Sequence, residues 1–320
     1  VDYHRESQAK HHPETPAWWL LARSLPMTTA ARLGAMDRVA IVNQWLLTTN
    51  PVARYTAEDP GGIVEALSAA FPDCAVIVRG LLPEREPDLT GDFARAGFRM
   101  IPYRRVWIVD DGAEALREKR VARRDLQLLE RSDYVVREDP DLLDSQAERL
   151  ADLYCQLYIG KHSRHNIRFR PEFIRLALRC GLWRMAAFEK DGRIDAFVSW
   201  FVKDGRITGA VGGYDLSLPR KLGLYRQLMI HQTRLAAELG LPLYISSGVG
   251  EFKALRGASP YLEYEAIWDR HLSPRRRAPW ALLDALTHRS VPRLELKRKR
   301  SPGSRLGRWL AGSPARPAGC

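Results

Sequence analysis

The 320-residue sequence predicts an α+β protein of two lobes, each a mixed, mostly antiparallel twisted sheet flanked by helices. Length is the first observation, because a domain usually has about 100–200 residues. Strand-like and helix-like segments also alternate in both halves of the chain, which is typical of layered folds. Finally, Asp191-Gly192 and Asp204-Gly205 separate consecutive strand-forming runs, as hairpin turns do.

The first part of the chain divides into an N-terminal segment without clear periodicity, residues 1–35, and a lobe over residues 36–111. Strand and helix patterns follow one another in this lobe. Strands are expected at residues 39–48, 74–79 and 99–109, and helices at residues 62–71 and 92–96. Because the sequence starts with Val1 instead of Met, we leave open whether an upstream domain precedes it.

A strongly basic helix is predicted over residues 113–131, within a linking segment of residues 112–135 that also includes the start of a short strand. The helix contains no Gly or Pro, and its leucines and alanines form an apolar stripe. The basic residues on the rest of its surface include Arg117, Arg120, Arg123 and Arg124.

A second lobe is predicted over residues 136–273, beginning with helices at 142–159 and 171–180. Gly181 and Gly240 mark the ends of predicted helices. The remaining elements are strands at 183–189, 194–203 and 207–214, a long helix at 218–239, a strand at 242–246, a short helix at 251–256 and a strand at 262–270.

The last segment, residues 274–320, is basic. The cluster Arg275-Arg276-Arg277 precedes an apolar helix at 280–286. Several prolines and a glycine after residue 300 predict that the final residues form a flexible tail.

Charge and cysteine usage limit the class of protein. The chain has 50 Lys+Arg against 38 Asp+Glu, a formal net charge of +12. An anionic partner explains this balance, and the alternative is an arginine-rich surface inherited from the composition of the proteome. The four cysteines form no C-x-x-C pair, which argues against a zinc site or a disulfide framework and fits a reducing cytoplasm. No apolar run approaches the roughly 18–20 residues of a membrane span, so we expect a cytoplasmic protein with no membrane partner.

An anion-binding loop is predicted between Gly213 and the long helix. A strand leads there through Arg220-Lys221-Leu222-Gly223-Leu224-Tyr225 into a helix N-terminus, whose backbone N–H groups and dipole attract phosphate. Arg220-x-x-Gly223-x-Tyr225 resembles the Arg/Gln-x-x-Gly-x-Gly/Ala loop with which GNAT acyltransferases hold the pyrophosphate of acetyl-CoA. The resemblance implies a GNAT-like fold for the lobes and a donor-binding role for Arg220, Lys221, Gly223 and Tyr225. Tyr225 departs from the pattern, since its ring should obstruct a pyrophosphate, and an ordinary first helical turn is the alternative.

A second segment, Phe252-Lys253-Ala254-Leu255-Arg256-Gly257, resembles the Phe-Lys stretch of the Fem family. Those tandem-GNAT enzymes take an amino acid from aminoacyl-tRNA. By this resemblance Lys253 stabilises charge on the ribose leaving group, Phe252 forms a wall of the site and Arg256 binds the donor. The alternative is a surface cation. A partly exposed lysine has little structural value, so we expect Lys253→Ala to reduce turnover with little loss of folding.

The acceptor is predicted to bind a polar loop between two helices. Residues 157–166 resemble the Tyr-x-x-Lys-x-Ser/Arg-x-Asn stretch of Fem-like proteins, which implies acceptor-binding roles for Lys161, Arg164 and Asn166. Tyr214 and Asp215, at the end of the strand predicted at 207–214, are assigned the same role. The alternative for residues 157–166 is an ordinary polar loop. The histidines in this loop lack a third ligand at suitable spacing, so no metal site is expected.

The general base is left open among four residues and a water relay. Amine attack requires removal of a proton, and Asp215, His231, Glu251 and Glu263 lie near the site segments in the sequence.

Together these features predict an aminoacyl-tRNA-dependent aminoacyltransferase that forms an amide bond on a small amino acid or analogue, in a peptide or antibiotic pathway. It needs no cofactor, since aminoacyl-tRNA is the co-substrate, and its oligomeric state is left open. The predicted tRNA contacts are Arg117, Arg120, Arg123, Arg124, Arg275, Arg276 and Arg277. One alternative is an acetyl- or acyl-CoA-dependent N-acyltransferase, and another is a non-catalytic nucleic-acid-binding module on a GNAT scaffold.

Overall fold

The computed structural model describes residues 29, 31–42, 44, 47, 49, 54–138 and 140–299, with the side chains of residues 140, 142 and 289–299 left out. The described residues divide into two compact units. Unit 1 is formed by the residues up to 44, by 54–104 and by those from 262 onward, and unit 2 is formed chiefly by 105–261. The predicted flexible tail after residue 300 lies outside the described residues.

Unit 1 contains strands that neighbour one another in the order β1-β2-β9-β3. Strand β1 (Val39–Val42) is parallel to β2 (Ala75–Leu81), and β2 is antiparallel to β9 (Ala258–Trp268), which neighbours β3 (Arg99–Val109). Strands β3 and β9 each contribute residues to both units. The helices of the unit are α3 (Asp59–Ala70), α4 (Pro87–Arg95) and α12 (Pro274–Lys299).

Unit 2 continues from β3 in the order β3-β8-β7-β6-β5-β4. All neighbouring pairs in it are antiparallel except β7 and β8, which are parallel. The strands are β4 (Val135–Arg137), β5 (Arg184–Lys190), β6 (Arg193–Lys203), β7 (Arg206–Tyr214) and β8 (Leu243–Tyr244). The two predicted Asp-Gly turns are present, and both residues of each have positive φ, as type I′ hairpins require.

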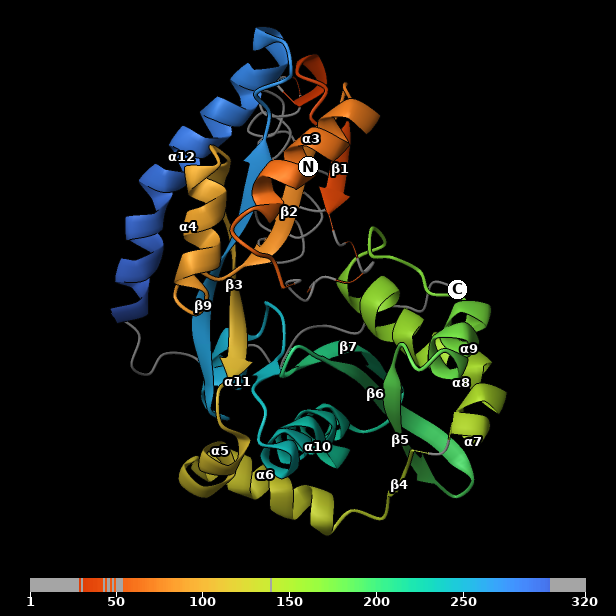
Figure 1. Cartoon of the computed structure of the whole chain (residues 1–320). Coiled ribbons are helices and arrows are strands. Elements are labelled where there is room, and N and C mark those ends of the chain that lie inside the picture. The colour runs from red at the N-terminus through yellow and green to blue at the C-terminus, as the bar shows by residue number, and fades with distance from the viewer. Residues whose placement is uncertain are drawn as a thin grey trace, which may run out of the picture. The chain divides into compact units, whose positions relative to one another are not determined.

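Helices cover both faces of the sheet of unit 2 (Figure 1). On β6, Phe197 and Phe201 face a core formed with α8 and α9, and Val198 and Trp200 face a core formed with α5, α6 and α10. The alternation explains why β6 reads as an almost continuous apolar run. The helices are α5 (Gly112–Glu118), α6 (Arg120–Glu130), α7 (Pro140–Ser145), α8 (Ala147–Tyr154), a π-helix (Cys155–His162), α9 (Pro171–Arg179), a 3₁₀-helix (Arg220–Leu222), α10 (Leu224–Leu239) and α11 (Gly250–Ala254).

The predicted α+β class, with a mixed, mostly antiparallel twisted sheet flanked by helices, is confirmed. The single basic helix predicted at 113–131 is wrong in one respect, because Lys119 is extended (φ −90°, ψ 112°) and separates α5 from α6. The break lets the two helices pack on different turns of α10. Gly112 of α5 lies against the backbone of Ala237, and Leu128 of α6 lies against Gly223. Lysine is a good helix former, so no local pattern marks this break.

Two further helices begin or continue differently from the prediction. The segment 142–159 holds α7, α8 and the π-helix, and the long helix starts at Leu224 after a 3₁₀ turn. The compact units also divide the chain differently from the sequence-based domains, since residues 262–273 pack in unit 1 and the basic helices in unit 2.

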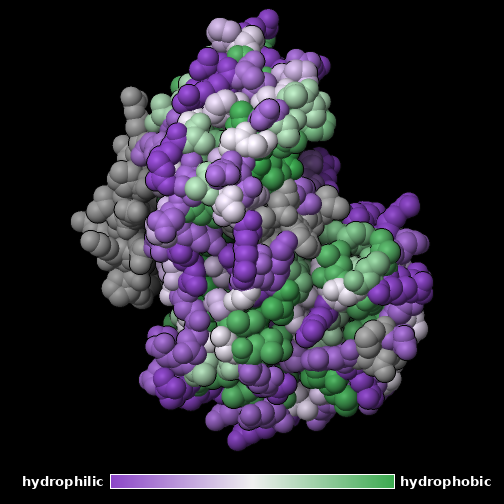
Figure 2. Space-filling view, viewed as in Figure 1, coloured by the Kyte–Doolittle hydropathy of each residue, from purple (hydrophilic) through white to green (hydrophobic). Residues whose placement is uncertain are grey.

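No helix in the described part of the chain is both long enough and apolar enough to cross a membrane. On the face shown in Figure 2, hydrophilic residues cover most of the surface and hydrophobic residues gather in separate patches.

Candidate functional site

The predicted donor loop has the backbone that its glycine requires. Gly223 is left-handed (φ 64°) and caps the N-terminus of α10 directly after the 3₁₀ turn. A Cβ atom on Gly223 would lie 2.8 Å from Leu128 Cδ2, so both conformation and space favour glycine. Arg220 and Lys221 are exposed beside it. The loop therefore presents positive charge at the start of a 16-residue helix.

Tyr225 fills the position at which the GNAT loop has a small residue. Its ring centroid lies 5.1 Å from that of Phe252 and 6.1 Å from that of Tyr214. Burial raises the pKa of the Tyr225 phenol, and the neighbouring hydroxyls of Tyr158 and Tyr214 raise it further. The fold therefore brings the rings of Tyr225, Phe252 and Tyr214 together.

Arg256 is held by a buried carboxylate that sequence reasoning missed. Asp125 on α6 is fully buried and accepts hydrogen bonds from Arg256 Nε (2.6 Å) and Arg226 Nε (2.7 Å). The Arg256 guanidinium also lies 3.4 Å from the ring centroid of Phe252 and donates to the Phe252 carbonyl (2.7 Å). Burial lowers the pKa of Arg256, with Asp125 acting in the opposite direction.

The signal for Asp125 was present in the sequence. It lies three residues after Ala122 and four before Leu129, on the buried stripe of the basic helix. An acid at such a position needs a buried cationic partner.

Lys253 is buried, with 3% of its surface exposed. Its ammonium donates to the backbone carbonyls of Ile245, Ser246 (3.1 Å) and Ser247 (2.8 Å). An ammonium has three donors, so these bonds occupy it and tie α11 to the loop after β8. The expectation of a partly exposed lysine without structural value is wrong.

The predicted acceptor residues fall into two groups. Lys161, at the end of the π-helix, lies with its Nζ 3.2 Å from the hydroxyl of Tyr214, so these two are brought together. Arg164 is exposed, whereas Asn166 donates to the Tyr158 carbonyl (2.8 Å) and closes the end of the π-helix. A π-helix is frequent at functional sites, and sequence patterns do not predict one.

Asp215 is committed to a network of its own. Its carboxylate accepts from Arg149 (2.8 Å), from Arg193 and from the backbone N–H of Ser217 (2.9 Å), and the side chain is 4% exposed. Burial raises a carboxyl pKa, but the hydrogen bonds from Ser217 and Arg149 outweigh it and hold the pKa of Asp215 at about 2. Such a carboxylate is a poor proton acceptor near neutral pH.

The other candidate bases differ in surroundings. His231 is buried within α10, with Nε2 3.4 Å from an oxygen of the exposed Glu138. Glu263 belongs to unit 1 and pairs with Arg104 (3.2 Å). Of the four candidates, Glu251 in the first turn of α11 is the exposed one. Across the described residues, no three His, Cys, Asp or Glu side chains cluster as metal ligands.

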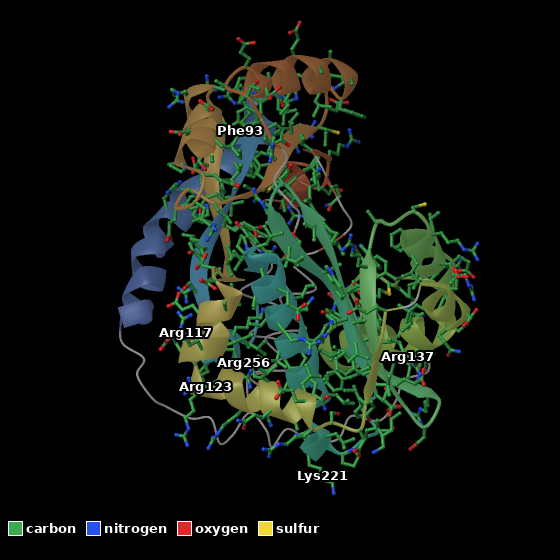
Figure 3. All side chains as sticks on the ribbon, turned by 60° about the horizontal axis from the view of Figure 1, so that its bottom comes forward. Phe93, Arg117, Arg123, Arg137, Lys221 and Arg256 are labelled. Carbon is green, nitrogen blue, oxygen red and sulfur yellow. The ribbon has the colours of Figure 1, made fainter. Side chains whose placement is uncertain are left out.

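The predicted tRNA contacts are divided between the two units. Arg117, Arg120, Arg123 and Arg124 are exposed on α5 and α6 of unit 2, and Figure 3 shows Arg117 and Arg123 projecting from these helices. The Arg275–Arg277 cluster opens α12 of unit 1.

Comparison with known proteins supports the fold. Residues 116–261 match the family described as acetyltransferase (GNAT) domain. The C-terminal domain of a putative lysylphosphatidylglycerol synthetase from Agrobacterium fabrum is 18% identical over 72% of this chain and 77% of its own, with a TM-score of 0.53. L-PGS from Bacillus licheniformis is 17% identical over 71% of this chain and 78% of its own, with a TM-score of 0.50.

FemX is 10% identical over 72% of this chain and 80% of its own, with a TM-score of 0.52. No curated protein sequence matches the chain. At these identities the solved structures show a shared fold, and the family match covers the segment that carries the donor loop and Lys253. Residues 116–261 thus form a GNAT acyltransferase domain, as the loop at Arg220–Tyr225 predicted.

Proposed function

We propose that this acyltransferase takes an aminoacyl group from aminoacyl-tRNA and transfers it to the amine of a small amino acid or amino acid analogue. The observation that carries the proposal is Tyr225. Its half-buried ring stands in the donor loop where acetyl-CoA-dependent enzymes of the resemblance have Gly or Ala, and it packs against Phe252 and Tyr214. A fixed ring at this point disfavours a pyrophosphate close to the helix N-terminus.

The basic surface of unit 2 supports a nucleic-acid donor. Exposed arginines on α5 and α6 lie on the helices next to α10, whose first turn follows the donor loop. Rows of exposed cations bind phosphodiesters with strong salt dependence. FemX and the lysylphosphatidylglycerol synthetase are relatives in fold whose names agree with aminoacyl transfer. Since aminoacyl-tRNA is a cytoplasmic substrate, the proposal places the reaction there.

In the proposed reaction the acceptor nitrogen attacks the ester carbonyl that joins the aminoacyl group to ribose. A C–N bond forms and the bond between the acyl carbon and the ribose oxygen breaks, while the amine loses a proton and the ribose oxygen gains one. We propose that Lys161 and Tyr214, with Arg164, bind the acceptor, and that Arg220 and Lys221 bind the donor. The ammonium of Lys253 holds the loop after β8 in place. We therefore propose that Lys253 affects the ribose leaving group through the position of that loop.

A CoA-dependent N-acyltransferase is the second candidate. It is favoured by Gly223, whose left-handed conformation preserves the turn of the resembled pyrophosphate loop, and by the family match itself.

A donor assay distinguishes the two candidates. The purified chain is incubated with radiolabelled aminoacyl-tRNAs or with radiolabelled acetyl-CoA, at low and moderate salt. The acceptors are a panel of small amino acids and, separately, vesicles containing phosphatidylglycerol. The proposal expects transfer from aminoacyl-tRNA to a small amine, weakening as salt rises. Transfer from acetyl-CoA alone would overturn it, and transfer to the vesicles alone would replace the proposed acceptor with a lipid.

A further inference from the structure

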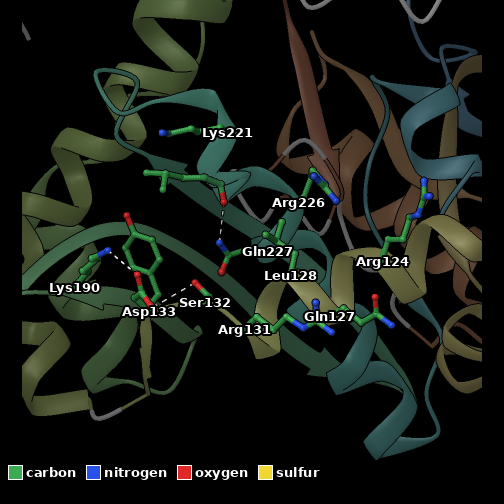
Figure 4. Close-up of a pocket in the computed structure, with 12 residues that line it drawn as sticks. Arg124, Gln127, Leu128, Arg131, Ser132, Asp133, Lys190, Lys221, Arg226 and Gln227 are labelled. Carbon is green, nitrogen blue, oxygen red and sulfur yellow. Dashed lines mark hydrogen bonds and ion pairs between the residues drawn. The ribbon is translucent and has the colours of Figure 1, made fainter.

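An open pocket of about 430 Å³ lies beside the donor loop in unit 2 (Figure 4). Its walls come from α6 and the residues after it, from Lys190 at the end of β5, and from the start of α10. Lys221 and Leu222 belong both to this pocket and to the donor loop. The volume falls in the range of small-ligand sites.

Three of the five cations in the lining have no carboxylate partner among the described residues. Five cations and one carboxylate surround the pocket: Arg124, Arg131, Lys190, Lys221, Arg226 and Asp133. Lys190 pairs with Asp133 (2.9 Å), and Arg226 is bound by Asp125. Arg124, Arg131 and Lys221 form no ion pair with any described residue. Arg124 and Arg131 are seven apart on α6 and the turn after it, and so project from the same side of the helix.

Gln227 adds a buried hydrogen-bond acceptor to the same wall. It is 2% exposed, and its Nε2 donates to the Leu222 carbonyl (3.0 Å), as the dashed line in Figure 4 marks. That bond fixes which end of the amide is nitrogen. Its Oε1 is buried and has no donor among the described residues. A buried amide oxygen favours a partner that brings an O–H or N–H group.

We propose that this pocket binds a phosphorylated nucleoside, with the phosphate between Arg124, Arg131 and Lys221 and a hydroxyl or amino group of the nucleoside on Gln227 Oε1. An inorganic anion held between the cations brings no ribose hydroxyl or base amino group to the amide oxygen. A nucleotide supplies both groups in one ligand. The inference rests on the proposed function for its source, since a tRNA nucleotide and the phosphoadenosine of coenzyme A share this chemistry, and the experiment separates them.

The experiment compares Arg131→Ala with the matched control Arg184→Ala. Both arginines are exposed in unit 2, but Arg184 does not line the pocket and is not among the predicted tRNA contacts. Binding of uncharged tRNA and of coenzyme A is measured by titration calorimetry between about 50 and 200 mM salt. Arg131→Ala should weaken tRNA binding by about fivefold or more at low salt and reduce the salt slope by roughly 0.7–0.9. Arg184→Ala should change affinity by less than about twofold.

Adenosine 5′-monophosphate and inorganic phosphate test the second half of the proposal. The nucleotide should compete with tRNA or coenzyme A for the pocket of the wild-type protein. Inorganic phosphate at the same concentration should compete much less. Equal competition by the two would overturn the role of Gln227.

The outcomes for this pocket and for the proposed donor are separable. Weakened binding of coenzyme A with unchanged tRNA binding would support the pocket and count against the tRNA donor. Wild-type affinity of Arg131→Ala for both ligands would overturn the pocket, even if the wild-type protein transfers from aminoacyl-tRNA.

Discussion

Lys253 offers the sharpest test of how the site is built. We consider Lys253→Met, which removes the ammonium and keeps a side chain of similar length. In the folded protein the ammonium supplies hydrogen bonds to three successive carbonyls, from Ile245 to Ser247. The substitution leaves those carbonyls to find other partners.

The free-energy cost of losing the ammonium differs among the three carbonyls. Ile245 is 8% exposed, so water reaches its carbonyl poorly, whereas Ser247 is exposed and its carbonyl can turn to solvent. A hydrogen bond from a charged donor contributes about 1.5–3 kcal/mol, and an unpaired buried acceptor costs about 1–3 kcal/mol. Counting the loss mainly at Ile245, Lys253→Met should reduce the free energy of unfolding by about 2–4 kcal/mol. For a domain of roughly 150–250 residues this lowers Tm by about 4–16 °C.

Thermal unfolding and turnover should be measured on the same samples, below the Tm of the variant. Lys221→Met is the control for stability, because Lys221 is exposed and forms no ion pair with a described residue. We expect Lys253→Met to lower both Tm and turnover, and Lys221→Met to leave Tm within about a degree. A wild-type Tm with strongly reduced turnover would refute the structural reasoning and make Lys253 a directly catalytic group.

Three further predictions concern Asp125, Asp215 and Tyr225. Asp125→Asn should reduce the free energy of unfolding by about 3–5 kcal/mol in chemical denaturation, because it leaves buried guanidinium charge uncompensated; a loss no larger than that of the surface variant Glu118→Gln would contradict this. The pKa of Asp215 is lower in the folded state than its ordinary value of 3.8. Its ionised carboxylate therefore adds about 2 kcal/mol to the free energy of unfolding above pH 5, and this stabilisation is lost as pH falls through 4 toward 2. The stability difference between wild type and Asp215→Asn should therefore shrink over that window, and a difference independent of pH would disprove it. If the Tyr225 ring obstructs the loop, Tyr225→Ala should bind coenzyme A more tightly in calorimetry than wild type or Tyr225→Phe. A folded Tyr225→Ala with no gain in affinity would show that the ring does not obstruct the loop.

Much of the fold was predictable because its signals are local. The Asp-Gly turns require positive φ and fixed the hairpins of β5, β6 and β7, and Gly240 marked the end of α10 at its left-handed residue. The break at Lys119 was not predictable, since lysine is a good helix former and the helices on both sides of it pack on α10. Strand β9 was placed four residues late, because Pro260 lies inside it and reads as a strand boundary.

The candidate site segments were chosen from the sequence, but the environment of their side chains was not predictable from it. The loop at Arg220–Tyr225 and the Phe252-Lys253 segment were chosen from residue order, because a loop that binds phosphate needs its glycine and cations at fixed spacing. Whether a lysine is buried depends on carbonyls that precede it by six to eight residues in a loop of irregular shape. Such a loop has no sequence period, so Lys253 was expected at the surface.

The contacts around Asp125 join the two predicted segments into one structure. Asp125 holds Arg226 in the first turn of α10, directly after the donor loop, and Arg256, which lies over Phe252. Phe252 in turn packs on Tyr225 of the donor loop and immediately precedes Lys253. A substitution at Asp125 should therefore affect the donor loop through Arg226 and the loop after β8 through Arg256 and Phe252. Because these contacts join packed or charged groups, we expect the donor and leaving-group positions to shift together and not independently.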